Sequence, residues 1–244
     1  MLSTPQNSAS DDGRSPADAQ LAGRFAALRQ RLAEVAQSSG RDVDSITLLA
    51  VSKGQETGRL RAALELGIRR FGENYVDEAL GKIHAMHGAG AEWHFIGRVQ
   101  ANKTRAVAEH FDWVHGVDRA RTAERLSAQR PQHAPPLNVC VQINIAGEAA
   151  KAGVAPEAAL PLLRTVGAMP RLRLRGLMTM LPFELPGPEQ RRAFGSLRAL
   201  RDQANAAGLA LDTLSMGMSG DFEAAIAEGA TIVRIGTALF GPRS

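Results

Sequence analysis

The chain has 244 residues, 44% hydrophobic and 22% charged, a balance typical of a globular protein and not of a disordered or fibrous one. The net charge of +4 is spread along the chain, which argues against a nucleic-acid partner. The single cysteine, Cys140, excludes an intrachain disulfide and a cysteine metal cluster. No apolar run approaches the roughly 20 residues of a membrane helix, and the N-terminus lacks the pattern of a secretory signal. We therefore expect a cytoplasmic protein with no membrane partner.

The N-terminal region divides into two parts. Residues 1–17 are rich in Ser, Pro, Asp and Gln, which predicts a disordered leader, so the folded domain is expected to span residues 18–244. From 19 to 36, apolar residues recur at three- and four-residue steps, which indicates an amphipathic helix.

After this helix, short β-rich runs alternate with helical stretches. The expected strands are 46–51, 68–71, 93–96, 113–117, 137–145, 172–177, 211–214 and 231–235. The expected helices between them are 60–66, 76–86, 103–110, 120–129, 157–166, 189–206 and 222–228. Most strand runs are continuously apolar, which is typical of a parallel sheet buried on both faces.

Eight strands alternating with helices predict a single-domain α/β protein, a (β/α)₈ TIM-type barrel. A doubly wound open sheet is the alternative, but it usually carries a G-x-G-x-x-G turn after its first strand. Here the first strand ends in Ser52-Lys53-Gly54 without such a turn. The barrel is the better interpretation, and it directs attention to the residues that follow each strand.

Two of these loops indicate a phosphate site. Barrels commonly bind phosphate with the loops after strands seven and eight. The seventh loop offers glycines and Ser219, and the eighth offers Gly236 and Thr237, a backbone N–H and a hydroxyl. Each residue alone could be an ordinary helix cap or turn, but two such loops in the expected positions favour a phosphate ligand.

Two cations suggest the chemistry. Lys53 follows the first strand, where partial burial could free a neutral amine for a Schiff base. Arg234 lies in the eighth strand between Val233 and Ile235, either as a buried structural ion pair or facing the mouth to donate to a ring nitrogen. A lysine beside a phosphate site fits a carbonyl cofactor such as pyridoxal phosphate, or a sugar-phosphate aldolase.

The remaining candidates favour structural interpretations. His84 and His87 are three residues apart on a helix but lack further metal ligands nearby, and His94 is expected to be a satisfied core histidine. No metal site is predicted. The methionines after strands six and seven are expected to pack around the barrel top.

Six segments together resemble the pyridoxal phosphate homeostasis protein family. They span almost everything from Ile46 to Arg243. The segments are Ala50-Val51-Ser52-Lys53, Phe71-Gly72-Glu73-Asn74-Tyr75-Val76, His94-Phe95-Ile96-Gly97 with Gln100 and Asn102-Lys103, Gly176-Leu177-Met178-Thr179-Met180, Ser215-Met216-Gly217-Met218-Ser219 with Asp221, and Val233 to Gly241. Two departures, Gly54-Gln55-Glu56-Thr57 and Arg98-Val99, leave the cofactor positions intact.

The resemblance implies a barrel like the N-terminal domain of alanine racemases, with pyridoxal 5′-phosphate as ligand. It implies a Schiff base on Lys53 and Arg234 beside the pyridine nitrogen. The cofactor-binding residues that it implies are Lys53, Asn74, Met216, Ser219, Arg234, Gly236 and Thr237. Lys151 matches a second lysine that the family often carries after the fifth strand.

The expected function is to bind, buffer and deliver the cofactor without efficient catalysis, as a monomer, with cofactor-dependent apo-enzymes as recipients. Racemases on this barrel take a second acid/base, a tyrosine, from an added domain. Here the chain ends at Ser244, just past the expected eighth strand, so no residues remain to build such a domain. The sole tyrosine, Tyr75, would have to serve within the barrel. A racemase-type enzyme and the aldolase stay open as alternatives.

Overall fold

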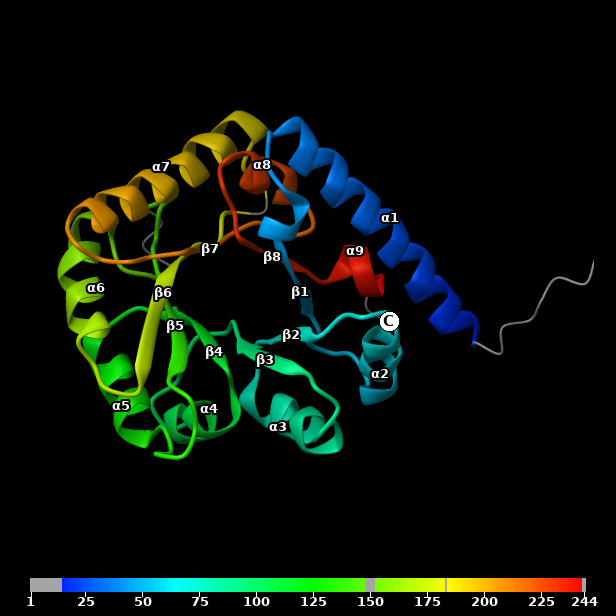
Figure 1. Cartoon of the computed structure of the whole chain (residues 1–244), viewed down its shortest axis with the longest axis horizontal. Coiled ribbons are helices and arrows are strands. Elements are labelled where there is room, and N and C mark those ends of the chain that lie inside the picture. Colours follow the sequence, from blue (N-terminus) through cyan, green and yellow to red (C-terminus); the bar gives the residue numbers. More distant parts are fainter. Residues whose placement is uncertain (1–14, 148–151, 183, 243–244) are drawn as a thin grey trace, which may run out of the picture.

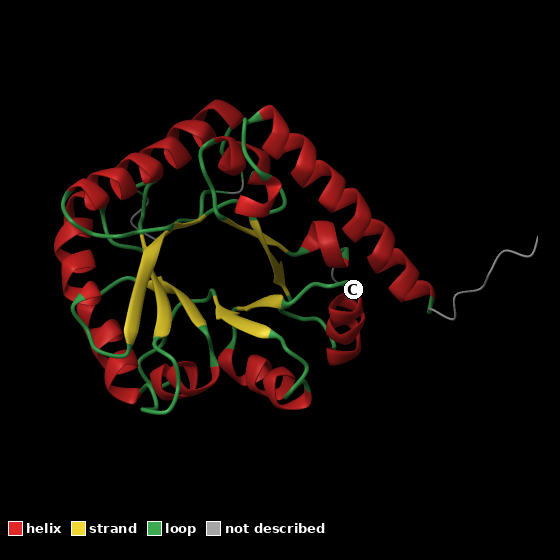
Figure 2. Cartoon of the chain, in the orientation of Figure 1, coloured by secondary structure: helices red, strands yellow, loops and turns green. Residues whose placement is uncertain are grey.

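Eight parallel strands close into a barrel, as Figure 2 shows with the ring of strands inside the helices. The computed structural model describes residues 15–147, 152–182 and 184–242. Each strand pairs with its sequence neighbours, and β8 pairs with β1 to complete the ring. The strands are β1 (Thr47–Val51), β2 (Arg70–Glu73), β3 (Glu92–Phe95), β4 (Trp113–Val117), β5 (Leu137–Gln142), β6 (Leu172–Met178), β7 (Thr213–Ser215) and β8 (Ile232–Ile235). The prediction of a barrel over an open sheet is confirmed.

One helix follows each strand, and one long helix precedes the barrel. They are α1 (Pro16–Ser38), α2 (Thr57–Glu65), α3 (Val76–Ala85), α4 (Thr104–His110), α5 (Ala120–Gln129), α6 (Ala159–Gly167), α7 (Gly187–Ala206), α8 (Phe222–Ala227) and α9 (Thr237–Phe240). Short 3₁₀ turns lie at Val43–Ser45 and Pro156–Ala158. In the described part of the chain, none of the helices has the length and apolar character that crossing a bilayer requires.

Helix α1 lies along the outside of the barrel, against α2, α8 and α9 (Figure 1). Its start is fixed by Ser15, whose side chain accepts a hydrogen bond from the Asp18 N–H, with Pro16 in the first helical position. The last two residues of the predicted leader, 16 and 17, therefore belong to the helix. The rest of that predicted leader, residues 1–14, lies outside the described residues.

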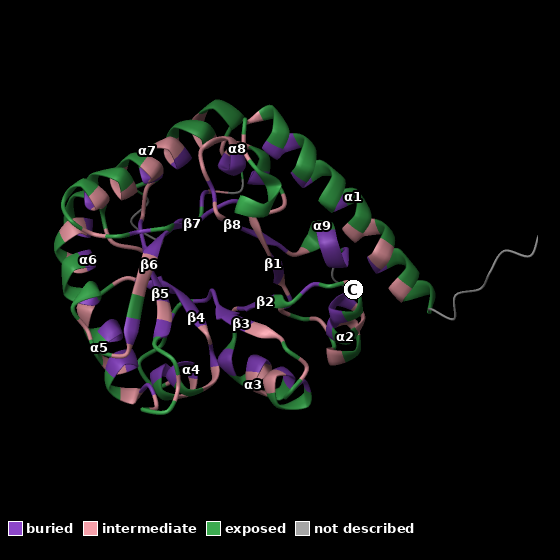
Figure 3. Cartoon of the chain, viewed as in Figure 1, coloured by how far each residue is buried: buried purple, intermediate pink, exposed green. Residues whose placement is uncertain are grey.

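The core consists of an outer layer and a smaller inner cluster. The outer layer packs the strands against the helices, whose buried faces turn inward in Figure 3. The inner cluster contains only six buried residues, Leu49, Ile96, Trp113, Cys140, Met178 and Ile232. Polar side chains, among them His94, His115, Ser215 and Arg234, are buried beside it. The interior of the barrel, between its two open ends, is thus partly polar.

Candidate functional site

A cavity of about 340 Å³ opens at the C-terminal mouth of the barrel. Small-molecule and cofactor sites usually measure about 300–1,000 Å³. The walls come from the ends of β1, β2, β3 and β8, from the loops after β6 and β7, and from α7. The lining residues are Val51, Lys53, Asn74, Ile96, Met180, Gln190, Met218, Ser219, Gly220, Asp221, Arg234, Gly236 and Thr237.

Six of the seven predicted site residues line this cavity. They are Lys53, Asn74, Ser219, Arg234, Gly236 and Thr237, from four different strand ends. They meet because the carboxyl ends of all strands in a parallel barrel face the same side.

Met216 is the exception. It is fully buried in the outer core layer and is not among the residues lining the cavity. The cause is the alternation of side chains along a strand: Ser215 points into the barrel, so Met216 points outward. Gly217 then turns the chain with φ of 94°, and Met218 returns to line the cavity. Met218, and not Met216, therefore lines the cavity, and a contact of Met216 with the cofactor stays a prediction.

Lys53 is half-buried in the cavity wall and makes no hydrogen bond or ion pair with any described residue. The turn that carries it is held on both sides. The Ser52 hydroxyl donates to Glu73 at 2.6 Å, and the Gly54 N–H donates to Glu78 at 2.6 Å. The amine is therefore free while its backbone is fixed.

Behind this turn lies a buried ion pair that sequence reasoning missed. The Lys82 Nζ donates to Glu73 Oε1 at 2.8 Å, to Glu78 Oε1 at 2.5 Å and to the Ser52 carbonyl at 2.7 Å. Burial raises the pKa of Glu73 against the hydrogen bonds from Lys82 and Ser52. The i,i+4 spacing of Glu78 and Lys82 on α3 was a detectable signal. No signal in the sequence indicated that Glu73, at the end of β2, is the other partner of Lys82.

Arg234 is 3% exposed and forms no ion pair with any described residue. One terminal nitrogen donates to the Ser215 carbonyl at 2.6 Å, and the other donates to the Thr179 carbonyl at 2.8 Å. Burial lowers its pKa to about 10, so the guanidinium stays charged at neutral pH. Among the described residues, Arg234 therefore does not form the structural ion pair that the sequence left open as an alternative.

The loops after β7 and β8 are joined at the cavity. The Ala238 N–H points at the Ser219 hydroxyl oxygen at 3.4 Å, which brings the start of α9 next to the β7 loop. The Asp221 carboxylate accepts the Met218 N–H at 2.5 Å and so closes the β7 loop on itself. Burial raises the pKa of Asp221, while the hydrogen bond from Met218 opposes this rise.

Asn74 supplies a buried polar atom with no partner. Its side-chain oxygen is shielded from solvent and forms no hydrogen bond with the described residues. The backbone of Asn74 is packed against Gly97, where a Cβ would collide with the Asn74 carbonyl oxygen. An acceptor held in a cavity without a donor is what a bound ligand would satisfy.

The other candidates lie elsewhere. Tyr75 is 63% exposed and lines a separate small pocket, so it does not take the role within the barrel that the sequence suggested. His84 and His87 are exposed, and His94 is buried with both ring nitrogens bonded, as expected of a core histidine. Lys151 lies outside the described residues.

Comparisons with known proteins give the family. Residues 24–244 match the model of the alanine racemase N-terminal domain. The chain is 53% identical over 223 residues to the pyridoxal phosphate homeostasis protein of Pseudomonas aeruginosa, covering 91% of this chain and 96% of that protein. It is 47% identical over 232 residues to that of Escherichia coli, covering 91% and 97%. The chain belongs to the pyridoxal phosphate homeostasis protein family.

Solved structures place this family member on a familiar fold. PipY of Synechococcus elongatus, described as a structure with PLP bound, matches with a TM-score of 0.80 and 36% identity over 91% of this chain and all of that one. Alanine racemase of Corynebacterium glutamicum matches with a TM-score of 0.67 at 18% identity, covering 91% of this chain and 60% of that one. At 18% identity, the match to the racemase shows only that the two proteins share the barrel fold.

Proposed function

We propose that this protein binds pyridoxal 5′-phosphate in the C-terminal cavity and contributes to homeostasis of that cofactor by binding, buffering and delivering it. The observation that carries the proposal is that two cations, Lys53 and Arg234, line the same cavity. Neither forms an ion pair with a carboxylate among the described residues. Unpaired cations in a cavity of cofactor size attract an anionic ligand. The relatives that bear the homeostasis name, and PipY with its bound PLP, support the identity of that ligand.

The residues present fit this cofactor. When bound, the cofactor supplies an aldehyde that condenses reversibly with an amine. Lys53 offers the amine, on a turn that Glu73 and Glu78 hold in place. Ser219, Gly236 and Thr237 offer a hydroxyl pair and backbone N–H groups to a phosphate. Arg234 offers an N–H to the ring nitrogen, and because it stays protonated it would keep that nitrogen unprotonated.

We infer further that the protein has no efficient racemase or decarboxylase activity. Among the described cavity residues, the only titratable ones are Lys53, Asp221 and Arg234. Tyr75, the single tyrosine of the chain, points to solvent outside the cavity. A missing general acid/base typically reduces a rate by about 10²- to 10⁴-fold. We propose a carrier that acts as a monomer and passes the cofactor to apo-enzymes.

The test has two parts. The purified protein is loaded with cofactor, its visible spectrum is recorded before and after borohydride, and the modified lysine is mapped by mass spectrometry. No reducible adduct would overturn cofactor binding and leave the aldolase alternative. The loaded protein is then incubated with single L-amino acids, and racemisation and α-proton exchange are followed. Turnover at ordinary enzyme rates, about 1 s⁻¹ or faster, would overturn the carrier role.

A further inference from the structure

A chain of hydrogen bonds crosses the interior of the barrel from one mouth to the other. Arg234 contacts the Ser215 hydroxyl at 3.0 Å, and that hydroxyl lies 2.7 Å from His115 Nδ1. The Nε2 of His115 lies 2.9 Å from His94 Nδ1, and His94 Nε2 lies 2.7 Å from Glu92 Oε1. The chain thus begins in the cofactor cavity and ends at Glu92, in the first position of β3.

The middle of this chain is closed to water. Ser215 and His115 are fully buried, and His94 is 1% exposed. The link between Ser215 on β7 and His115 on β4 spans the barrel, because β4 and β7 are not neighbours in the ring. Glu92 is partly exposed and forms an ion pair with Arg70 at 3.3 Å. The ring of His94 stacks on Trp113 with centroids 5.3 Å apart, which fixes its plane.

The two ends of the chain determine every proton within it. A carboxylate can only accept, so His94 donates from Nε2 to Glu92 and, when neutral, accepts at Nδ1. His115 must then donate from Nε2 and accept at Nδ1, so the Ser215 hydroxyl donates to it. A guanidinium can only donate, and the Ser215 oxygen accepts from Arg234. With both rings neutral, both histidines are therefore Nε2–H tautomers, and all hydrogen bonds run in one direction.

Burial favours the neutral form of both histidines. Burial lowers the pKa of His115 well below 6.5, and the nearby His94 and Arg234 add to this effect. Burial also lowers the pKa of His94, against the opposing influence of Glu92 and Asp112 and with the help of Arg70. A proton added to either ring would reverse the hydrogen bond between His115 and Ser215, so that the Ser215 hydroxyl would accept from His115 and no longer donate to it.

We propose that Glu92, His94 and His115 are positioning residues: acting through Ser215, they hold the Arg234 guanidinium in the orientation that the bound cofactor requires. The inference rests on the proposed function. Ser215 is the only side chain that contacts the Arg234 guanidinium among the described hydrogen bonds, the other partners being carbonyl oxygens. A change at the N-terminal mouth should consequently alter cofactor binding at the opposite mouth.

The first experiment uses the protein without cofactor. Nitrogen-15 NMR of the imidazole rings should show His94 and His115 as neutral Nε2–H tautomers between pH 6 and pH 9. In Glu92→Ala, the tautomer of His94 should no longer be fixed. A charged ring or an Nδ1–H tautomer in the unaltered protein would overturn the assignment, whether or not the cofactor binds.

The second experiment measures the cofactor dissociation constant and the visible band of the bound cofactor in matched variants. Loss of a hydrogen bond typically weakens binding by about two- to tenfold. We expect such a loss in Ser215→Ala and a smaller one in Glu92→Ala. Glu92→Gln keeps an oxygen acceptor for His94 and should restore binding. Asp212→Ala, which removes a carboxylate from the same mouth but outside the chain, should bind like the unaltered protein.

The double variant separates coupling from general damage. Within the Ser215→Ala background the chain is already broken, so Glu92→Ala should add nothing to the loss of affinity. Additive losses, or equal losses in Asp212→Ala, would overturn the proposal and leave a purely structural role. If the unaltered protein binds the cofactor with a reducible adduct but Glu92→Ala binds equally well, the inference fails while the proposed function stands.

Discussion

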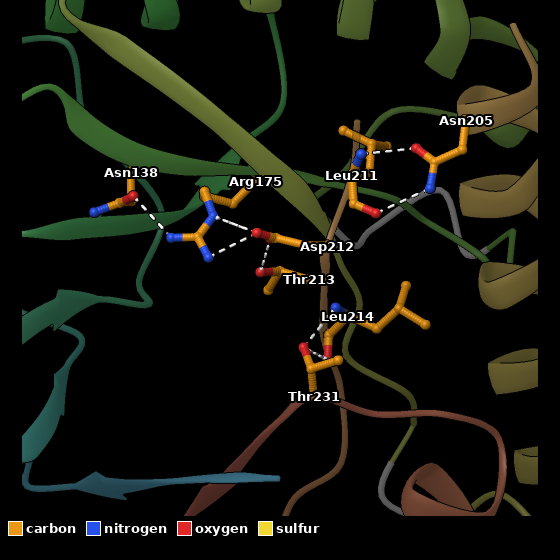
Figure 4. A network of polar contacts seen from close by, with 8 residues as sticks. All are labelled: Asn138, Arg175, Asn205, Leu211, Asp212, Thr213, Leu214 and Thr231. Atoms are coloured by element: carbon orange, nitrogen blue, oxygen red, sulfur yellow. Dashed lines mark hydrogen bonds and ion pairs between the residues drawn. The ribbon is translucent and has the colours of Figure 1, made fainter. Parts of the chain in front are cut away.

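The two mouths of the barrel use the same kinds of charged residue in opposite ways. A polar cavity of about 490 Å³ opens at the N-terminal mouth, lined by Arg70, Arg173 and Arg175 together with Glu92 and Asp212. Most of these charges neutralise one another. Arg175 pairs with Asp212 at 2.8 Å and donates to Asn138, as Figure 4 shows. Its guanidinium also lies over the Trp113 ring. Arg173 makes no such pair among the described residues, but it is exposed and solvated.

At the C-terminal mouth the cations face the cavity without carboxylate partners. Lys53 and Arg234 are both within the cavity wall, and the ion pairs that Lys82 forms with Glu73 and Glu78 lie behind the turn that carries Lys53. Charges that are already paired stabilise a fold but offer little to a ligand. Cations held in place without an ion-pair partner keep more of their attraction for an anionic ligand, although Asp221 in the same cavity offsets part of that of Arg234. The contrast supports the proposal that the ligand binds at the C-terminal mouth.

Removing Lys53 should produce the largest effect. In Lys53→Ala the cavity loses the only amine among its described lining residues, so we expect no lysine adduct after borohydride, measured by mass mapping of the loaded protein. Lys103→Ala is the matched control, because Lys103 is paired with Asp77 outside the cavity. An adduct found mainly on Lys103 or Lys151 in the unaltered protein would assign the attachment elsewhere.

Breaking the buried pair behind Lys53 should reduce stability more than breaking an exposed one. Lys82→Met leaves Glu73 buried without its cation, which typically costs about 3–5 kcal/mol in unfolding free energy. Lys103→Met breaks the exposed pair with Asp77 and should cost about 1 kcal/mol or less. Urea denaturation measures both. Equal losses would mean that Lys82 is not the main partner of Glu73.

Thr237 and Thr231 offer the same substitution at opposite mouths. A hydrogen bond to a charged group contributes about 1.5–3 kcal/mol, so Thr237→Val should weaken cofactor binding at least several-fold with the fold intact. Thr231 instead bonds the Leu214 backbone at the N-terminal mouth, so Thr231→Val should lower stability and leave affinity unchanged. An unchanged dissociation constant in Thr237→Val would move the phosphate away from this loop.

The fold was predictable because its signals are local. Each strand is a short apolar run and each helix has its own periodicity. Their alternation, with no G-x-G-x-x-G turn after the first strand, favoured a barrel over an open sheet, and a barrel places the loops that carry Lys53, Ser219 and Thr237 at one mouth. The sequence did not show that Met216 lies in the core and outside the cavity lining. Its direction depends on the inward-pointing Ser215 and on the turn at Gly217, and neither is visible in the residue types alone.

The polar interior was not predictable, because its pairs form only after the barrel closes. Ser215 and His115 are 100 residues apart and belong to strands on different sides of the ring. His94 was expected to be a satisfied core histidine, and it is, but the sequence could not name its partners. The sequence also did not indicate that Lys82 of α3 bonds Glu73, because the two meet only when α3 packs against β2.

The smallest expected effect, on the free energy of unfolding, comes from breaking the ion pair of Asp212 with Arg175 at the N-terminal mouth. Burial would raise the pKa of Asp212, but hydrogen bonds from Arg175 and Thr213 outweigh it and hold this pKa below 3.8. A carboxyl whose pKa is lower in the folded state adds stability above its unfolded pKa and loses it as the pH falls through the folded value. The Asp212 side chain is 53% exposed, so the contribution should be about 1 kcal/mol or less. Asp212→Asn should therefore be slightly less stable than the unaltered protein in urea at pH 7, and the difference should shrink toward pH 3. A difference that grows as the pH falls would show that this carboxylate is a burden on the fold, and the contrast between the two mouths would fail.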